Sequence, residues 1–257
     1  MTQNRKYTVI TGASSGIGYE AAKAFSNIGK NVIIVARRSE KLLKLKEEIV
    51  AQNPTINVIT KSVDLSKSEA SLELYRELKN YEIETWINNA GFGFDGLLID
   101  QSLENISEMI HLNVETLALL STLYAKDYKD VSGAQLVNIA SIVGYELIPK
   151  TVSYAATKFF VTAFTEGLDQ ELKFNNYKLR AKILAPAATK SEFSGIARNS
   201  EEFNYEQNFE RYHTAAEMAE FLLQLYNSDK TVGIVNSETY QFELNDNLHK
   251  FTTQKDQ

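Results

Sequence analysis

The sequence contains no cysteine, which excludes disulfide bridges and thiolate chemistry. Its three histidines, His111, His213 and His249, are far apart along the chain, which argues against a zinc site. No apolar stretch is long enough for a signal peptide or a membrane span, so we expect a soluble, cytoplasmic protein. The net charge of -6 argues against a nucleic-acid-binding protein, because such proteins carry a basic stripe.

The chain of 257 residues, 44% of them hydrophobic, is long enough for one α/β domain with a substantial core. Short apolar runs rich in β-branched residues alternate with stretches of helical periodicity. The expected strands are 6–11, 32–35, 57–59, 86–88, 136–139, 181–184 and 232–235. Alternation of this kind predicts a doubly wound, Rossmann-like parallel sheet of about seven strands with helices on both faces. No repeat, low-complexity tract or linker divides the chain, so we expect a single domain over 1–257 with a polar tail at about 246–257.

A glycine-rich segment follows the first expected strand and precedes a helix expected over 16–29. Glycines in a strand-to-helix turn let the backbone approach a pyrophosphate, and unpaired N–H groups at the helix N-terminus attract the anion. The spacing is Gly-x-x-x-Gly-x-Gly rather than Gly-x-Gly-x-x-Gly, and a plain glycine turn is the alternative. The expected phosphate-binding residues are Gly12, Ser14, Ser15, Gly16, Ile17 and Gly18.

Tyr154 and Lys158 stand at i and i+4 of a helix expected over 152–174, so their side chains share one face. The pKa of a free tyrosine is about 10, and a neighbouring ammonium group favours the phenolate and lowers that pKa. The phenol can then transfer protons near neutral pH. A surface helix can carry both residues by chance, but Ser141, which precedes Tyr154, and the glycine turn together favour a catalytic role.

These motifs follow one another, over nearly the whole chain, as in the short-chain dehydrogenase/reductase family, which this sequence resembles. The matching positions also include Asn88, Asn89, Ala90, Gly91, Asn113 and Pro186. The resemblance implies that Tyr154 is the general acid and that Ser141 hydrogen-bonds the substrate carbonyl. It further implies that Lys158 binds the nicotinamide ribose while lowering the tyrosine pKa. Asn113 would hold a water molecule in a proton relay.

The residues after the second strand bear on the cofactor, because ligands of an open α/β sheet lie beyond the carboxyl ends of the strands. Arg37 and Arg38 stand there, with no acidic residue before Glu40. A carboxylate at this place suits the ribose of NAD, whereas arginine accommodates a 2′-phosphate. The pair therefore favours NADP(H) over NAD(H). Solvated arginines that open the next helix are the alternative.

Two further strand ends supply cofactor contacts by resemblance. Asp64, followed by Leu65, would meet the adenine amino group, but Asp64 can equally be the N-cap of the next helix. Asn89 can hydrogen-bond backbone at its strand end, and Gly91 allows a close approach of the cofactor; Ala90 between them is also expected to contact the cofactor. For Asn88 a structural and a catalytic role are both open.

The sixth strand ends at Pro186, and Ala187 follows where the family more usually has glycine. The extra methyl group of Ala187 means that the backbone beside the nicotinamide can differ from the usual geometry of the family. By resemblance Thr189 and Ser191 would hold the carboxamide and the pyrophosphate.

A substrate lid is expected over about 188–212 by the same resemblance. Aromatic residues in and near it predict an apolar pocket, although they can equally serve to pack the lid onto the body. These aromatic residues are Phe92, Phe94, Tyr145, Phe193, Phe203, Tyr205, Phe209 and Tyr212. Lys190 and Arg198 are the only basic residues between Pro186 and Tyr205, which favours an uncharged, bulky carbonyl over a keto acid.

The motifs together predict an NADPH-dependent oxidoreductase that reduces a ketone or aldehyde. A nucleotide-sensing regulatory protein on the same fold is the alternative, but that role usually accompanies loss of the serine, tyrosine or lysine. A sugar-nucleotide epimerase would have another glycine spacing and a longer C-terminal domain. Apolar residues spread widely around the 152–174 helix and predict a homodimer or homotetramer. They are Ala155, Ala156, Phe159, Phe160, Val161, Ala163 and Phe164.

Overall fold

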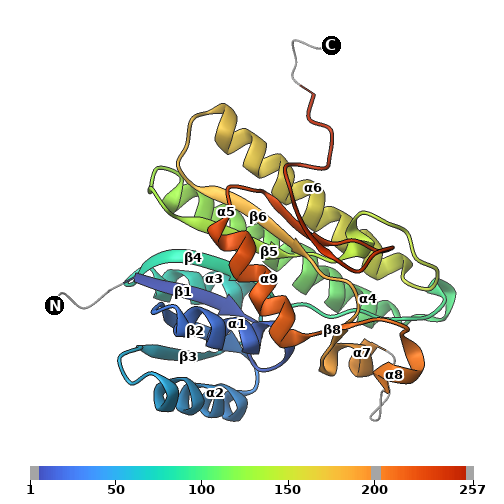
Figure 1. Ribbon diagram of the computed structural model, residues 1–257, viewed down its shortest axis with the longest axis horizontal. Helices are drawn as coiled ribbons and strands as arrows, with labels where there is room; N and C mark the ends of the chain where they lie inside the picture. The colour runs from blue at the N-terminus through green and yellow to red at the C-terminus, as the bar shows by residue number, and fades with distance from the viewer. Residues whose placement is uncertain (1–5, 198–203, 253–257) are drawn as a thin grey trace.

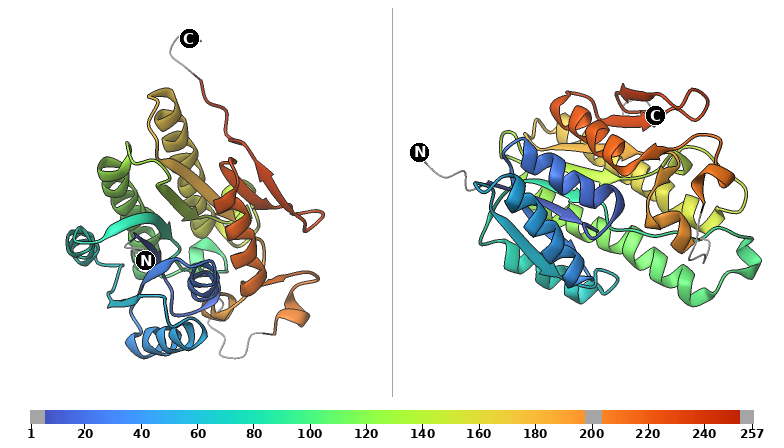
Figure 2. Two further views of the ribbon diagram at one scale, coloured as in Figure 1. Left: turned by 60° about the vertical axis from the view of Figure 1, so that its left-hand side comes forward. Right: turned by 60° about the horizontal axis from the view of Figure 1, so that its bottom comes forward.

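The computed structural model describes residues 6–197 and 204–252. Within these residues one large sheet of eight strands lies between two layers of helices (Figures 1 and 2). The strand order is β10-β9-β6-β5-β4-β1-β2-β3, and every pair is parallel except β10 with β9. This arrangement confirms the predicted doubly wound, Rossmann-like fold class.

The strands of the large sheet are β1 (Lys6–Thr11), β2 (Asn31–Ala36), β3 (Val58–Ser62), β4 (Glu82–Asn88), β5 (Gln135–Ile139), β6 (Arg180–Ala185), β9 (Val232–Val235) and β10 (Phe242–Asn245). The α-helices are α1 (Gly16–Asn27), α2 (Ser39–Gln52), α3 (Ser68–Leu78), α4 (Leu103–Ile110), α5 (Leu117–Tyr128), α6 (Val152–Phe174), α7 (Glu192–Ala197), α8 (Tyr205–Asn208) and α9 (Ala215–Asn227). A π-helical turn, η2 (His111–Thr116), joins α4 to α5, and 3-10 turns η1 (Leu98–Asp100) and η3 (Ile142–Gly144) precede α4 and α6. Short strands β7 (Thr189–Lys190) and β8 (His213–Thr214) pair outside the large sheet.

The inner strands of the sheet are buried on both faces, which explains their continuous apolar sequences, whereas the edge strands β3 and β10 are only partly buried. Ile10 and Ile34 pack in a cluster with residues of α1, α2 and α9. Val9 and Ile33, one position earlier in each strand, pack instead with residues of α3, α5 and α6. Successive side chains of a strand point to opposite faces, so one apolar run supplies both layers of the core.

The fold differs from the sequence prediction in two places, one in the sheet and one in the first helix. It has eight strands rather than about seven, because Phe242–Asn245 forms an antiparallel edge strand whose register is set by β9. The first helix ends at Asn27 rather than at 29, because Gly29 adopts a φ of 82° and terminates it.

The chain crosses from the β3 edge back to β4 beside β1, so β1 and β4 flank the point where the strand order reverses. Such a switch point opens a crevice at the carboxyl ends of the strands. The glycine turn follows β1 there, and the Asn89-Ala90-Gly91 segment follows β4.

Candidate active site

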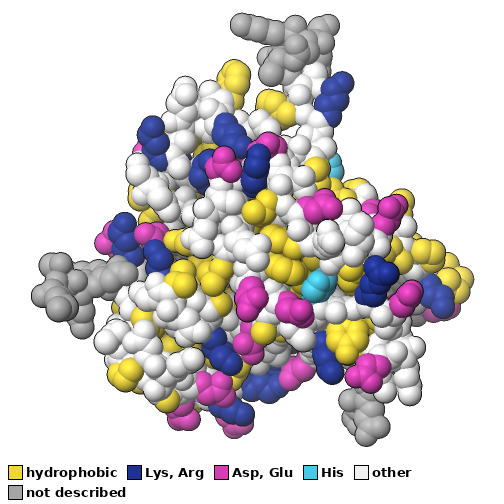
Figure 3. Space-filling model, viewed as in Figure 1, with side chains coloured by type: hydrophobic (Ala, Val, Ile, Leu, Met, Phe, Trp, Pro, Cys, Tyr) yellow, Lys and Arg dark blue, Asp and Glu magenta, His cyan; other side chains and the backbone are white. Residues whose placement is uncertain are grey.

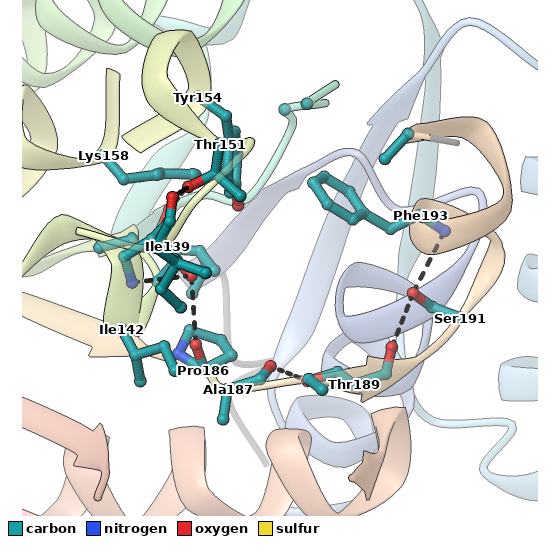
Figure 4. Close-up of a pocket in the computed structure, with 18 of the residues that line it drawn as sticks. Ile139, Ile142, Thr151, Tyr154, Lys158, Pro186, Ala187, Thr189, Ser191 and Phe193 are labelled. Atoms are coloured by element: carbon teal, nitrogen blue, oxygen red, sulfur yellow. Dashed lines mark hydrogen bonds between the residues drawn. The ribbon is translucent and has the colours of Figure 1, made fainter. Parts of the chain in front are cut away.

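A cavity of about 700 Å³ opens beyond the carboxyl ends of β1, β4, β5 and β6. Figure 4 shows Tyr154 and Lys158 of α6 on one side and Ser191 and Phe193 of the predicted lid on the other. Most of the predicted site residues line this cavity. They are Gly12, Ser15, Gly16, Ile17, Asn89, Ala90, Gly91, Ser141, Tyr154, Lys158, Pro186, Thr189 and Ser191. Ser14, Gly18, Arg37, Arg38, Asp64, Leu65 and Asn113 are not among the lining residues.

Tyr154 lies against the backbone of Gly93, where a Cβ added to the glycine would stand 2.6 Å from the tyrosine Cδ2. Burial raises the pKa of Tyr154 above its ordinary value, and a hydrogen bond with Ser141 opposes that rise. The direction is opposite to the lowering predicted from the neighbouring lysine. In this structure desolvation outweighs any effect of the ammonium group.

Lys158 is buried, with only 6% of its surface exposed. Its Nζ donates to the Ile139 carbonyl at 2.9 Å and lies 5.7 Å from the centre of the Tyr154 ring. Burial lowers the pKa of Lys158 to about 8. The predicted shared face of Tyr154 and Lys158 is therefore present, and both side chains face the cavity.

Asn113 is buried in the π-helical turn η2. Its Oδ1 accepts from Phe92 N at 3.1 Å, and its Nδ2 donates to Phe92 O at 2.8 Å and Thr157 Oγ1 at 3.1 Å. A Cβ on Gly91 would stand 3.0 Å from Asn113 Oδ1 and 3.8 Å from Lys158 Nζ. Asn113 thus lies near Lys158, and its hydrogen bonds in this structure are to Phe92 and Thr157. Single π-helical turns are common at functional sites.

The glycine turn needs its glycines for two reasons. Gly12 has a φ of 67° and Gly16 a φ of 57°, in the left-handed region that favours glycine. A Cβ on Gly18 would stand 2.4 Å from Asn89 Nδ2 and 2.6 Å from Gly12 O. Ser15, the N-cap of α1, makes no side-chain cap hydrogen bond, and the first turn holds no acidic residue. The N-terminus of α1 can therefore receive an anion such as a pyrophosphate.

The two asparagines after β4 have different roles. Asn89 Nδ2 donates to Thr11 O at 2.9 Å and Gly12 O at 3.3 Å, so it ties the end of β4 to the glycine turn. Asn88 is buried and donates to Ser121 Oγ at 3.0 Å and to Asn138 Oδ1 at 2.9 Å. Of the two roles open for Asn88, the geometry shows the structural one.

Arg38 rather than Arg37 contacts the glycine turn. Its Nη2 donates to Ser14 Oγ and Ser15 Oγ, both at 2.9 Å, and its Nη1 donates to Glu192 Oε2 at 2.7 Å. Arg37 is exposed and contributes to a lowered pKa of Asp64. The structure thus separates the two arginines, which the sequence could not do.

Asp64 is not the N-cap of α3, so that alternative is wrong. The N-cap of α3 is Lys67, and Asp64 Oδ1 instead accepts from Ser66 N at 3.1 Å and Ser66 Oγ at 2.9 Å. Burial would raise the pKa of Asp64, but these hydrogen bonds outweigh it and the pKa is lowered. Leu65 is buried, and its carbonyl accepts from Thr116 Oγ1.

Some aromatic residues of the predicted lid line the cavity, and others pack the lid onto the rest of the protein. Phe193 and Phe209 line the cavity, and the Phe193 ring lies 5.6 Å from the Tyr154 ring. Tyr205 is buried, and its hydroxyl donates to Ser191 O at 3.0 Å while it accepts from Ser191 N at 3.2 Å. Tyr212 packs on Tyr205 and under Lys190. Phe203 and Arg198 lie outside the described residues.

Three aromatic residues outside the lid were also predicted to line the pocket, and this prediction is partly wrong. Phe94 lines the cavity, but Phe92 and Tyr145 do not. Tyr145 donates to the buried carboxylate of Glu166 at 2.6 Å and stacks on His249, so it faces away from the site.

Three charged residues that line the cavity are missing from the sequence prediction: Asp95, Glu146 and Lys150. Glu146 Oε1 accepts from Ser237 Oγ at 2.8 Å, and Ser237 and Tyr240 bring the β9–β10 turn to the same wall. Lys150 has a φ of 69°, which is unusual for a residue other than glycine and lies beyond what sequence patterns predict.

Known proteins match this chain in sequence and in architecture. A sequence model described as short chain dehydrogenase matches residues 6–202. The chain belongs to the short-chain dehydrogenase family. Dehydrogenase/reductase SDR family member 11 from Gallus gallus is a 31% identical relative over 195 residues, which are 74% of this chain and 76% of the relative.

Two solved structures are similar to this chain over most of their length. One is a short-chain dehydrogenase from Sphingobium yanoikuyae in complex with NADPH, with a TM-score of 0.82, 27% identity and coverage of 91% of this chain and 89% of that one. The other is the bulky-bulky ketone specific alcohol dehydrogenase from Comamonas testosteroni, with a TM-score of 0.77, 26% identity and coverage of 91% and 86%. A further similar structure, ElxO with NADP bound, has a TM-score of 0.75, 25% identity and coverage of 89% of this chain and 94% of that one.

In this short-chain dehydrogenase, no helix among the described residues is long and apolar enough to span a membrane. Within the same residues, no three histidine, aspartate or glutamate side chains gather as a metal site would need. Membership of the short-chain dehydrogenase family assigns this chain to the enzymes that carry out oxidoreduction at a CH–OH or C=O group.

Proposed function

We propose that this protein is an NADPH-dependent reductase of ketones or aldehydes. The proposal rests mainly on one observation: Tyr154, Ser141 and Lys158 line the same cavity as the glycine turn. When bound, the nicotinamide supplies the hydride to the carbonyl carbon. Tyr154 donates a proton to the carbonyl oxygen, and the Ser141 hydroxyl hydrogen-bonds the same oxygen as negative charge develops.

The residues around the cavity fit a nicotinamide nucleotide. The uncapped N-terminus of α1 would hold the pyrophosphate, and Lys158 would hold the ribose hydroxyls. Thr189 and Ser191 would hold the carboxamide and the pyrophosphate from the lid side. Asp64 would meet the adenine, and Asn113 would position a water molecule for proton relay.

The preference for NADPH rests on Arg38, which lies over Ser14 and Ser15 and supplies a planar, permanently charged donor set for a 2′-phosphate. Titration calorimetry of the purified protein with NADPH and with NADH tests it directly. We expect tighter binding of NADPH. Tighter binding of NADH would refute the cofactor preference and leave the oxidoreductase activity standing.

The substrate is proposed to be an uncharged, bulky carbonyl compound. Ile142, Val143, Phe94, Phe193 and Phe209 give the cavity an apolar wall, and burial of apolar substrate surface contributes about 25 cal/mol per Å². The similarity to a bulky-ketone alcohol dehydrogenase supports the same class. Lys150, which lines the cavity, is the cation that a keto acid would use.

Steady-state kinetics on matched carbonyls test the substrate class. Aryl ketones, cyclic ketones and hydrophobic aldehydes should show higher kcat/KM than pyruvate-like acids. A preference for the acids that disappears in Lys150→Ala would reverse the assignment and identify Lys150 as the carboxylate-binding residue. Location in the cytoplasm also stays a prediction, which cell fractionation tests.

A further inference from the structure

An ion-pair cluster joins the end of β2 to the first residue of the lid helix α7. Arg38 Nε and Nη2 donate to Ser14 Oγ at 3.1 and 2.9 Å, and Nη2 also donates to Ser15 Oγ at 2.9 Å. Arg38 Nη1 donates to Glu192 Oε2 at 2.7 Å, and Lys41 Nζ donates to the other oxygen of the same carboxylate. The side chains of Arg38 and Lys41 therefore both bind the carboxylate of Glu192.

This anion is within reach of solvent. The side chains of Arg38, Lys41 and Glu192 are 42%, 43% and 42% exposed. Burial would raise the pKa of Glu192, but hydrogen bonds from Lys41 and Arg38 outweigh it and lower the pKa, so the group is a carboxylate at neutral pH. An anionic ligand can reach the same cations from solution and compete with Glu192 for them.

We propose that Glu192 occupies the 2′-phosphate subsite of NADP(H) and must be displaced when that phosphate binds. Glu192 is then a determinant of cofactor affinity and preference. This inference rests on the proposed use of NADPH, and it adds a residue of the lid to the adenosine end of the site.

The groups around Glu192 suit a phosphate better than a carboxylate. A phosphate monoester carries a charge of about -1.5 to -2 near pH 7 and three acceptor oxygens, against one charge and two oxygens for Glu192. It can therefore neutralise Arg38 and Lys41 together and bind them by charge-assisted hydrogen bonds. NADH presents only a hydroxyl at this position and cannot replace a carboxylate there. Competition by Glu192 should therefore weaken the binding of NADPH and spare NADH.

Glu192 also connects the subsite to the lid. It is the first residue of α7, and at the other end of this helix Ala197 O accepts from Asp95 N at 3.0 Å. When the cofactor leaves, the Glu192 carboxylate can return to Arg38 and Lys41 and restore the ion pairs that hold α7 to the end of β2. Glu192 should therefore speed the dissociation of NADP⁺ as well as weaken its binding.

Titration calorimetry of Glu192→Gln tests the proposal with NADPH, NADH and adenosine 2′,5′-bisphosphate as ligands. The subsite becomes free when its internal competitor is removed, so we expect Glu192→Gln to bind NADPH and the bisphosphate about 3- to 10-fold more tightly than wild type. NADH binding should stay within about twofold, since NADH has no 2′-phosphate and does not displace the carboxylate. Stopped-flow measurements should show slower release of NADP⁺.

Glu206→Gln is the matched control, because Glu206 is an exposed carboxylate of α8 and its replacement changes the charge of the lid equally. Equal effects of the two variants on NADPH binding would overturn the proposal in favour of long-range charge. Weaker NADPH binding by Glu192→Gln would also overturn it. Loss of NADH binding alone would mean that Glu192 holds the ribose hydroxyls instead.

The proposed function fails by a different result. Wild-type protein that prefers NADH would refute the use of NADPH itself, whatever Glu192→Gln does. Wild-type protein that prefers NADPH, with Glu192→Gln unchanged, would refute only the role of Glu192. Arg38→Asp should abolish the NADPH preference in either background, which locates the subsite independently.

Discussion

Burial dominates the chemistry of the two central residues, Tyr154 and Lys158. It raises the pKa of the phenol and lowers the pKa of the ammonium to about 8. Each shift favours the neutral form of its group. The ammonium donates its hydrogen bond to the Ile139 carbonyl, and the phenol packs on Gly93. The tyrosine therefore stays protonated at neutral pH, which suits a proton donor in carbonyl reduction.

This pairing predicts that carbonyl reduction falls as the pH rises through about 8. Below that pH Lys158 is charged and Tyr154 is protonated; above it Lys158 loses the charge that binds ribose, while the raised pKa keeps the phenol protonated. The pH profile of kcat/KM reports groups of the free enzyme and is the measurement to make. In Lys158→Arg the remaining activity should persist to higher pH. A descending limb at the same pH in both proteins would contradict the assignment to Lys158.

Some roles of single residues could be predicted from the sequence, and others could not. Spacing along one helix was enough to predict that Tyr154 and Lys158 share a face. Two adjacent arginines cannot be told apart by spacing, and only the fold shows that Arg38 reaches Ser14. Glu192 lies 154 residues from Arg38 in the chain, so no local pattern signals their ion pair.

At the level of secondary structure, Lys182 fastens β6 to the end of α9. It is buried, and its Nζ donates to Leu225 O at 2.8 Å, Tyr226 O at 3.2 Å and Ser228 O at 2.7 Å. The last carbonyl groups of a helix have no partner within the helix, and a cation there also favours the helix dipole. Burial nevertheless lowers the pKa of Lys182 to about 8.

Lys182→Met should lower the free energy of unfolding by about 2 kcal/mol, because buried carbonyl oxygens lose their donor. Urea denaturation measures it, with the exposed Lys178→Met as a control expected to stay within about 0.5 kcal/mol of wild type.

The unfolded lysine binds its proton up to its ordinary pKa of 10.5, so wild-type stability should rise between about pH 8 and 10.5. A variant as stable as wild type, with the same pH dependence, would contradict this role.

Helices and strands with a clear hydrophobic periodicity could be predicted from the sequence. Elements that depend on contacts with neighbouring elements could not. The helix predicted over 152–174 has those bounds, because its apolar residues recur at helical spacing over its whole length. The edge strand Phe242–Asn245 is only four residues long and depends on pairing with β9. The π-helical turn at His111–Thr116 interrupts a pattern that reads as continuous helix, so the local geometry around Asn113 could not be predicted.

For the molecule as a whole, the surface exposes large apolar side chains on two segments. Leu103 is 83% exposed and Leu147 is 81% exposed, and both lie in segments that precede or begin α4 and α6. Figure 3 shows hydrophobic side chains gathered at the right-hand edge, where these segments lie in Figure 1. On α6 itself Phe160 and Phe164 pack partly against the protein's own core, while Ala156 and Ala163 are exposed.

The homodimer or homotetramer therefore stays a prediction, now supported by exposed apolar residues on two segments rather than by α6 alone. Light scattering at micromolar concentration should give a mass of at least twice 29 kDa. Replacing the exposed Leu103 and Leu147 by Gln should shift the mass toward the monomer, because less apolar surface is buried on association. A 29 kDa particle for wild type would refute the prediction.

The reductase assignment depends most on proton donation by Tyr154, and Tyr154→Phe tests it most directly. NADPH binding by calorimetry should stay within a few-fold of wild type, because only the phenolic hydroxyl is removed. Turnover of the best carbonyl substrate should fall by about 10²- to 10⁴-fold, the usual contribution of a general acid. Tyr145→Phe, which removes a hydroxyl bound to Glu166 away from the cavity, should keep its turnover. A Tyr154→Phe enzyme that retained most of its turnover would contradict the assignment.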